Sequence, residues 1–180
     1  MSLNLKTDEG KNIFQRLAEK SDVILEGFRP GVMDRLGVGY NEIKKANPKI
    51  IYCSLTGYGQ TGPLKDMAGH DLNFLAQSGV MSLIGEREGA PLIPGIQLGD
   101  LTGGLNAAIG ILLAIYARKN TGRGQFVDIS MTDCLMAMLP LSAGWLWQNG
   151  SPPERGNSVF CHRYAFYNVF ETADGKYVSL

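Results

Sequence analysis

The chain has 180 residues, of which 44% are hydrophobic and 19% are charged. This balance is ordinary for a globular protein, and the length allows one domain and the start of another. The 17 basic residues equal the 17 acidic residues, so no excess positive charge directs the protein to nucleic acid or to an acidic membrane surface. An anionic ligand would therefore be held locally, by a few well-placed cations.

The cysteines and histidines are too few and too scattered for a disulfide framework or a zinc site. Cys53, Cys134 and Cys161 form no CxxC pair, and His70 and His162 are the only histidines. We therefore expect no metal and three reduced thiols, which favour a cytoplasmic protein. Charges throughout the first 20 residues are not typical of a signal peptide.

Patterns of helix and strand alternate in the first part of the chain. Thr7 is a suitable helix cap, with two acids after it and apolar residues at helical spacing. Next come a strand over residues 22–25, a loop over 28–31, short helices over 32–36 and 41–46, and a strand over 49–55. Residues 57–63 are rich in glycine and predict a loop.

The middle of the chain continues the alternation. The predicted elements are a helix over residues 70–78, an irregular segment over 85–99, a helix over 101–118, a turn over 121–124, a strand over 126–129, and one long helix to about residue 147. The apolar stretch over 105–116 is too short to span a bilayer, and Asp133 and Pro140 interrupt the stretch over 131–147. We expect both to be buried core helices and no contact with a membrane.

Residues 149–157 combine glycine, serine, proline and charges, which is typical of a linker. Strand patterns follow over 164–172 and 176–180, and Asp174-Gly175 between them is a strong hairpin signal. The last strand stops in mid-pattern, so we expect a truncated chain. The alternation of strands and helices predicts an α/β fold with a mainly parallel sheet over residues 1–150. Residues 151–180 then form a linker and the first hairpin of a smaller domain.

His70 and Asp100 are the candidates for acid/base chemistry, because each is predicted to start a helix. A helix N-terminus is partly positive and favours an ionised Asp100 and a neutral His70, both able to accept a proton. Glycines after Asp100 would let a ligand approach the backbone, and backbone N–H groups there could stabilise a developing oxyanion. The alternative is structural: an Asp before a helix is often only a cap, and a lone His is often only packing.

Three cations lie in or beside the first loops. Lys6, Arg29 and Arg35 are suited to clamp phosphates, and the alternative is solvated surface charge. The glycine loop at 57–62 lacks the Gly-Lys-Ser/Thr of a Walker A motif, so we interpret it as a mobile loop.

Six strings, taken in order, resemble the class III CoA-transferase (CaiB/BaiF) family. They are Leu3-Asn4-Leu5-Lys6-Thr7, Glu26-Gly27-Phe28-Arg29-Pro30-Gly31, Gly57-Tyr58-Gly59-Gln60-Thr61-Gly62-Pro63, Leu98-Gly99-Asp100, Thr121-Gly122-Arg123-Gly124-Gln125 and Ala173-Asp174-Gly175. The resemblance covers essentially the whole chain. It is strongest to the α-methylacyl-CoA racemase branch, because Ala68-Gly69-His70-Asp71 resembles that branch's Ala-Gly-His-Asp motif, whereas transferases usually have an aromatic residue in place of the His.

The resemblance implies roles for nine residues. Asp100 matches the family's acid, a nucleophile in transferases and one of two acid/base groups in racemases, and His70 matches the other racemase group. The remaining seven match CoA-binding positions: Lys6 and Arg35 near the nucleotide phosphates, Gly27, Phe28 and Arg29 beside the adenosine, Asp71 in the His motif, and Met131 near the pantetheine or thioester.

The resemblance also implies an architecture. It predicts the central part of a Rossmann-like, CoA-binding large domain, followed by the start of a small α+β domain. Family members carry a further strand–helix unit before Leu3, and racemases carry a Glu that supports the His beyond Leu180. They form interlocked homodimers, so we expect the same of the complete protein.

Three functions remain open at this stage. The first is epimerisation of 2-methylacyl-CoA thioesters by two-base proton transfer between His70 and Asp100. The second is transfer of CoA between carboxylic acids through an aspartyl-CoA intermediate on Asp100. The third is an inert fragment or an acyl-CoA-binding subunit. In the first two, CoA belongs to the substrate and no cofactor is permanently bound.

Overall fold

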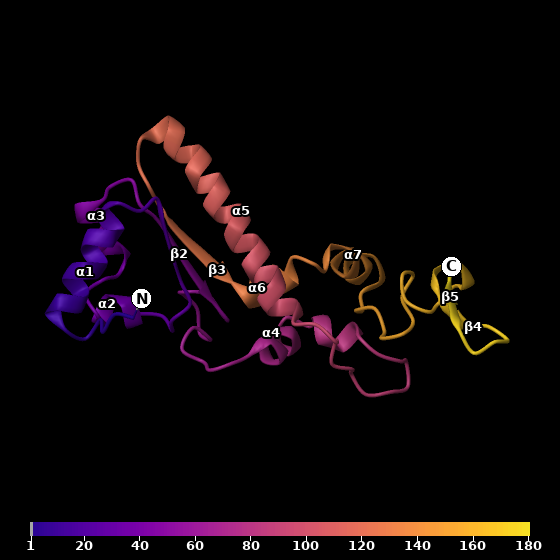
Figure 1. Cartoon of the computed structure of the whole chain (residues 1–180). Coiled ribbons are helices and arrows are strands. Elements are labelled where there is room, and N and C mark those ends of the chain that lie inside the picture. Colours follow the sequence, from indigo (N-terminus) through magenta and orange to yellow (C-terminus); the bar gives the residue numbers. More distant parts are fainter. Residues whose placement is uncertain (1) are drawn as a thin grey trace.

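The centre of the fold is a three-stranded parallel sheet, seen in a computed structural model that describes residues 2–180. The strands are β1 (Val23–Glu26), β2 (Ile51–Thr56) and β3 (Phe126–Ser130), in the order β1-β2-β3. Val23 pairs with Ile51, and Tyr52 pairs with Phe126. Helices cover both sides of the sheet (Figure 1). This confirms the predicted α/β class with parallel strands.

One face of the sheet is covered by α1 (Asp8–Glu19), α2 (Val32–Arg35) and α3 (Tyr40–Ala46). The Thr7 hydroxyl accepts the Gly10 N–H at 3.2 Å and so caps α1, as its sequence predicts. The helices bury a core against β2 that joins six residues: Ala18, Met33, Val38, Ile43, Ile50 and Tyr52.

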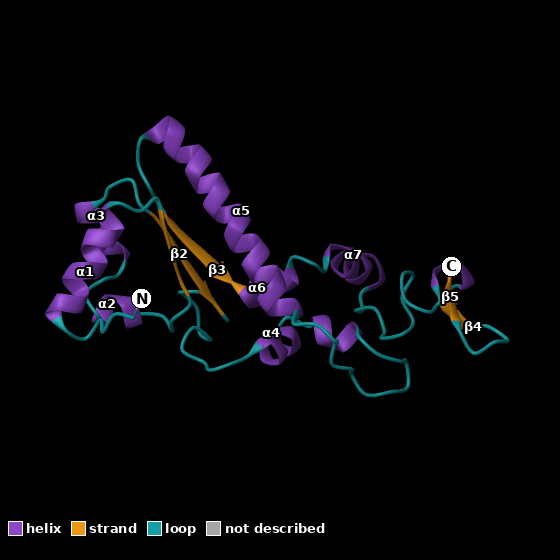
Figure 2. Cartoon of the chain, viewed as in Figure 1, coloured by secondary structure: helices purple, strands orange, loops and turns teal. Residues whose placement is uncertain are grey.

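The other face is covered by α5 (Leu98–Thr121), which runs along β2 and β3 (Figure 2). Small residues make this close approach possible. A Cβ atom on Gly103 would lie 2.8 Å from Cγ of Met131, and one on Gly110 would lie 2.9 Å from Cγ1 of Val127. A larger side chain at Gly103 would collide with Met131 of α6, and one at Gly110 would collide with Val127 of β3, so α5 or these neighbours would have to shift.

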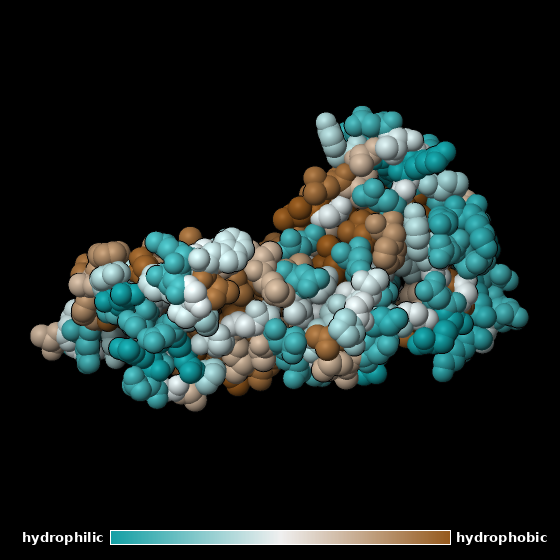
Figure 3. All heavy atoms as spheres, turned by 180° about the vertical axis from the view of Figure 1, so that it is seen from behind, coloured by the Kyte–Doolittle hydropathy of each residue, from teal (hydrophilic) through white to brown (hydrophobic). Residues whose placement is uncertain are grey.

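The opposite side of α5 is exposed, so the prediction of a fully buried core helix is wrong. The exposed apolar side chains include Leu101, Leu105, Ile109, Leu112, Leu113 and Tyr116. Figure 3 shows apolar surface along this helix, where the molecule is concave. By length and composition alone, α5 would be able to cross a bilayer, with a mean hydropathy of 1.6 over its most apolar window. Its inner side is occupied by the sheet.

A second core lies beyond the carboxyl ends of the strands. It is built by α4 (Asp71–Gln77), the short 3₁₀ helix η1 (Val80–Leu83) and α6 (Met131–Met136). Phe74, Leu75 and Leu135 are its buried centre. This cluster fixes the starts of α4 and α6 next to the sheet edge.

The single helix predicted up to residue 147 is in fact two. After α6 ends at Met136, α7 (Pro140–Asn149) begins with Pro140 at its first turn. Proline lacks the N–H that would continue a helix but suits the first turn of a new one. The prediction of a buried second helix is also wrong, because α7 contains no buried residue.

The chain ends in a small antiparallel hairpin of β4 (Val169–Glu171) and β5 (Tyr177–Ser179). The Asp174-Gly175 turn lies between them as predicted, with Gly175 at φ +75°. The first strand is shorter than predicted, because residues 165–167 form the 3₁₀ helix η2 (Ala165–Tyr167). Residues 140–180, here called the C-terminal arm, extend away from the sheet (Figure 1). The proposed domain division at residue 150 stays a prediction.

Candidate active site

A cavity of about 530 Å³ opens at the carboxyl ends of β1 and β2. Ligands of open parallel sheets bind at this edge, and the volume is within the usual range for small-molecule sites, about 300–1,000 Å³. The lining residues are Gly27, Phe28, Arg29, Pro30, Leu55, Thr56, Gly57, Tyr58, Lys65, Met67, Ala68, Gly69, His70, Asp71, Asn73, Phe74, Asp100 and Met131.

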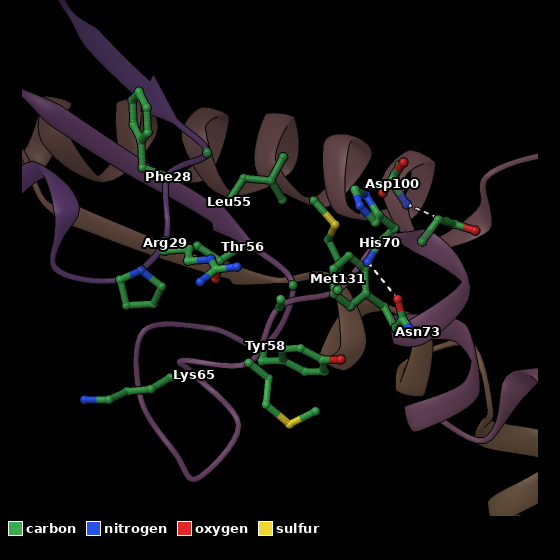
Figure 4. A pocket seen from close by; sticks show the side chains of 18 residues that line it. Phe28, Arg29, Leu55, Thr56, Tyr58, Lys65, His70, Asn73, Asp100 and Met131 are labelled. Atoms are coloured by element: carbon green, nitrogen blue, oxygen red, sulfur yellow. Dashed lines mark hydrogen bonds between the residues drawn. The ribbon is translucent and has the colours of Figure 1, made fainter.

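His70 and Asp100 come together at one end of this cavity (Figure 4). His70 is the N-cap residue of α4, where its backbone N–H donates to Oδ1 of Asn73 at 3.0 Å. Asp100 lies in the first turn of α5. Both side chains are exposed to the cavity side of the protein. The predicted convergence of two residues thirty positions apart is therefore confirmed.

Asp71 holds the two helix starts together. Its Oδ1 accepts the backbone N–H of Gly99 at 2.6 Å and that of Asp100 at 3.0 Å. The first residue of α4 thus caps the first turn of α5. Gly99 leaves room for this contact, since a Cβ there would lie 3.0 Å from the same carboxylate oxygen. We call this arrangement the Asp71 clasp.

The clasp overturns one expectation. The backbone N–H groups at the start of α5 were predicted to stabilise an oxyanion, but those of Gly99 and Asp100 already donate to Asp71, and that of Leu101 donates to the carbonyl of Gln97 at 3.0 Å. The first turn of α5 consequently has no free donor at these three positions. Their role is to fix the two helices.

The pKa of Asp100 also differs in direction from the value that the helix terminus alone would give. Burial raises the pKa of the Asp100 carboxyl, the negative charge of Asp71 raises this pKa further, and His70 lowers it. The helix terminus was expected to favour the ionised form, so the predicted direction is wrong. A raised pKa brings the carboxyl closer to the range in which it can both accept and return a proton.

The loop between β2 and α4 forms one wall of the cavity. Its two ends meet at the ring of Phe74: a Cβ on Gly57 would lie 2.2 Å from that ring, and one on Gly69 would lie 2.6 Å from it. Tyr58 packs edge-on against the same ring, with centroids 5.2 Å apart. The Thr132 hydroxyl donates to the Gly57 carbonyl at 2.8 Å. Glycine is therefore required at both ends of this loop.

Five of the seven predicted CoA-binding residues line the cavity. These are Gly27, Phe28, Arg29, Asp71 and Met131. Lys6 and Arg35 are not among the lining residues described. Arg35 instead reaches back toward its own loop, with Nη1 3.1 Å from the place where a Cβ on Gly31 would lie. The phosphate-binding roles of Lys6 and Arg35 stay predictions.

Sequence reasoning missed several lining residues, of which Lys65 and Thr56 matter most. Lys65 adds a second cation to the lining that contains Arg29. Its place between the glycine loop and the His motif was the available signal. Thr56 ends β2, where the predicted strand stopped one residue earlier. Tyr58 lies in the glycine loop, which we interpreted as a mobile loop and not as part of the site, and nothing local marks Asn73 or Phe74.

Comparison with known proteins supplies the family. The sequence profile of CoA-transferase family III matches residues 1–180. The chain belongs to this family. It is 42% identical to the acetyl-CoA:oxalate CoA-transferase of Acetobacter aceti, over 98% of this chain and 45% of that protein. It is 37% identical to the human alpha-methylacyl-CoA racemase, over 99% of this chain and 47% of that protein.

A solved structure agrees with both the family and the fold. A CaiB/BaiF family protein from Brucella suis matches with a TM-score of 0.89 and 34% identity, covering 98% of this chain and 46% of that one. The family III chain thus spans about half the length of these relatives. By their names, family III relatives include racemases and CoA-transferases, which supports the predicted class of enzyme.

Proposed function

We propose that this chain carries the acid/base pair of an enzyme that epimerises the α-carbon of 2-methylacyl-CoA thioesters. The observation that supports it most is the Asp71 clasp, which holds the helices of His70 and Asp100 together at one end of one cavity. An imidazole and a carboxyl with a raised pKa are both able to exchange protons.

The proposed reaction has two proton transfers. One of the two groups takes the α-proton, and the electrons of the broken C–H bond form a C=C bond as negative charge moves to the thioester oxygen. The other group then donates a proton to the opposite face of the same carbon, and the C=O bond reforms. His70 serves as base for one epimer and Asp100 for the other. After one turnover, the group that acted as base carries a proton and the other group has lost one.

The other end of the cavity suits the nucleotide part of CoA. Arg29 and Lys65 supply two cations for phosphates, and Phe28 offers an aromatic face. The cavity thus has a cationic end and an acid/base end (Figure 4). A long thioester with an anionic nucleotide head matches this distribution.

The test is exchange of the α-proton of a 2-methylacyl-CoA in deuterated water, followed by NMR. His70→Ala and Asp100→Asn should each reduce exchange by at least about 10²-fold, the usual scale of acid/base catalysis. Matched controls are His162→Ala, which changes the only other histidine, and Asp133→Asn, which changes an acid in the first turn of α6 outside the cavity lining. Undiminished exchange in either site variant would remove that residue from the mechanism.

CoA transfer is the second candidate, favoured by the transferase activity in the names of several relatives. In that reaction Asp100 attacks the acyl-CoA carbonyl, expels CoA thiolate and forms a mixed anhydride. The thiolate then attacks the aspartyl carbonyl of the anhydride, breaks its C–O bond and releases the donor carboxylate, which leaves an aspartyl thioester. Hydroxylamine traps such an adduct as a hydroxamate at Asp100. Proton transfer alone leaves no adduct, so mass spectrometry separates the two reactions.

A further inference from the structure

Among the residues that the structure describes, one buried side-chain hydroxyl forms no hydrogen bond. The buried polar residues are Ser54, Thr56, Ser78, Ser130 and Thr132. Four of their hydroxyls form hydrogen bonds: Ser54 donates to Glu26, Ser78 to the Leu75 carbonyl, and Thr132 to the Gly57 carbonyl, while Ser130 accepts the Asp133 N–H. The Oγ1 of Thr56 is buried and has no hydrogen-bonding partner among the described residues.

A buried hydroxyl without a hydrogen-bonding partner destabilises a fold, so its presence in the sheet calls for an explanation. Replacement by valine would keep the shape of the side chain and remove the unmet group. The backbone of Thr56 is fixed in the sheet, because Thr56 pairs with Ser130 at the end of β2. The residue is only 7% exposed. A ligand that completes the hydrogen bond is the simplest use for such a group.

Thr56 also has the right position to meet a ligand. It lines the cavity together with Arg29 and Met131. In Figure 4 it lies between the end that carries Arg29 and the end that carries His70 and Asp100. Rotation about the Cα–Cβ bond exchanges its methyl and hydroxyl groups, and threonine uses more than one such rotamer. A change of rotamer would therefore point the hydroxyl toward the cavity, where a bound ligand could accept its hydrogen bond.

The two ends of the cavity indicate which part of a bound CoA thioester would lie next to Thr56. Arg29 and Lys65 suit phosphates, and His70 and Asp100 suit the reacting thioester. In a CoA thioester these parts are joined by the pantetheine arm, whose polar groups are neutral amides and one hydroxyl. A neutral hydroxyl donor in a mostly buried wall fits an amide carbonyl, whereas a phosphate is better matched by the cations.

We propose that Thr56 is a ligand-binding residue whose hydroxyl donates a hydrogen bond to an amide carbonyl of the pantetheine arm of the CoA thioester. The inference rests on the proposed function for the identity of the ligand. It adds a residue that positions the chain of the substrate between its two anchored ends.

Calorimetric titration with CoA and with 3′,5′-ADP tests this assignment, since the second ligand lacks the pantetheine arm. Thr56→Val should weaken CoA binding about fivefold, the size of one neutral hydrogen bond, and should leave the affinity for 3′,5′-ADP unchanged. Thr56→Ser retains the hydroxyl and should bind CoA within about twofold of the wild type. Without ligand, Thr56→Val should melt at or above the wild-type temperature, because it removes an unmet polar group.

Each alternative outcome is distinct. Wild-type CoA affinity in Thr56→Val overturns the inference and leaves the proposed function standing. An equal loss for CoA and 3′,5′-ADP, or a lower melting temperature without ligand, also overturns it, because the hydroxyl would then serve the nucleotide or the fold.

Normal CoA binding by the wild type without α-proton exchange contradicts the proposed function but keeps Thr56 as a binding residue. No CoA binding by the wild type overturns both.

Discussion

The part of the chain that holds the sheet and the C-terminal arm differ in how they bury side chains. In the described part of the chain, every buried hydrophobic residue lies between Ala18 and Leu135, in the core next to the sheet or in the second core beyond the strand ends. The arm, residues 140–180, contains no buried residue, and its aromatic side chains are largely exposed. All residues that line the cavity also come from the first part. The buried hydrophobic side chains and the whole lining of the cavity therefore come from the first part of the chain, and the arm adds neither a buried side chain nor a lining residue.

The largest predicted effect comes from emptying the core behind the site. Leu75 is fully buried beside Phe74 and Leu135, so Leu75→Ala should lower the free energy of unfolding by about 3 kcal/mol. The matched change in the arm is Leu141→Ala, at a residue 67% exposed, and it should change stability by less than about 0.5 kcal/mol. Chemical denaturation measures both, and equal effects would contradict the contrast between the two parts.

Thiol reactivity should divide the chain in the same way. Burial, with smaller contributions from Glu26 and Asp128, raises the pKa of the Cys53 thiol to about 11 from its ordinary value near 9. Burial, followed by the charge of Asp133, also raises the pKa of Cys134. Only Cys161, in the arm, is partly exposed.

Iodoacetamide at neutral pH should therefore modify Cys161 first. The thiolate of Cys53 is about 100-fold scarcer than that of an ordinary thiol, because each pKa unit is a factor of ten. Peptide mass spectrometry over time follows the three sites, with urea-unfolded protein as the control in which all three react. Early labelling of Cys53 in the folded protein would show that the sheet opens readily.

The smallest effect is electrostatic and confined to the cavity. Asp71→Asn keeps an oxygen for the clasp and removes a negative charge that raises the pKa of Asp100. The ionised form of Asp100 becomes easier to form, so its pKa should fall, while burial keeps it above that of an exposed carboxyl. The pH at which Asp100 begins to act as a base should move lower by the same amount.

Carbon-13 NMR titration of the Asp100 carboxyl measures this shift without relying on activity. Asp174→Asn is the control, because Asp174 lies in the hairpin of the arm and bonds only within it, to Thr172 and Lys176. A pKa of Asp100 that stays the same in Asp71→Asn would remove Asp71 as a cause of the shift.

Local sequence signals predicted most elements and both acid/base candidates. The Thr7 cap, the alternation of strands with helices and the Asp174-Gly175 turn each depend on neighbours within a few positions, and each was confirmed. The resemblance to a family brought Gly27, Phe28, Arg29, Asp71 and Met131 to the site, and all line the cavity.

The errors arose where partners lie far apart in the chain. The oxyanion expectation for the start of α5 was wrong because Asp71, 28 and 29 positions away, already accepts those N–H groups. The burial of α5 was overestimated because composition does not show how much of an apolar helix the rest of the chain covers. The continuous helix up to residue 147 was wrong because the apolar pattern was allowed to outweigh the interruption at Pro140.

The Asp71 clasp has a consequence for how precisely the site can work. The carboxylate of Asp71, the residue after His70, is bonded to the turn of α5 that bears Asp100. The distance between the two candidate bases is therefore set by this one side chain and by the backbones of α4 and α5. For the thioester substrate proposed above, an acyl group too thick for that gap would have to break the charge-assisted hydrogen bonds of the clasp to widen it. Discrimination by thickness at the α-carbon would then come from backbone geometry, while the length of the acyl chain would be free to vary.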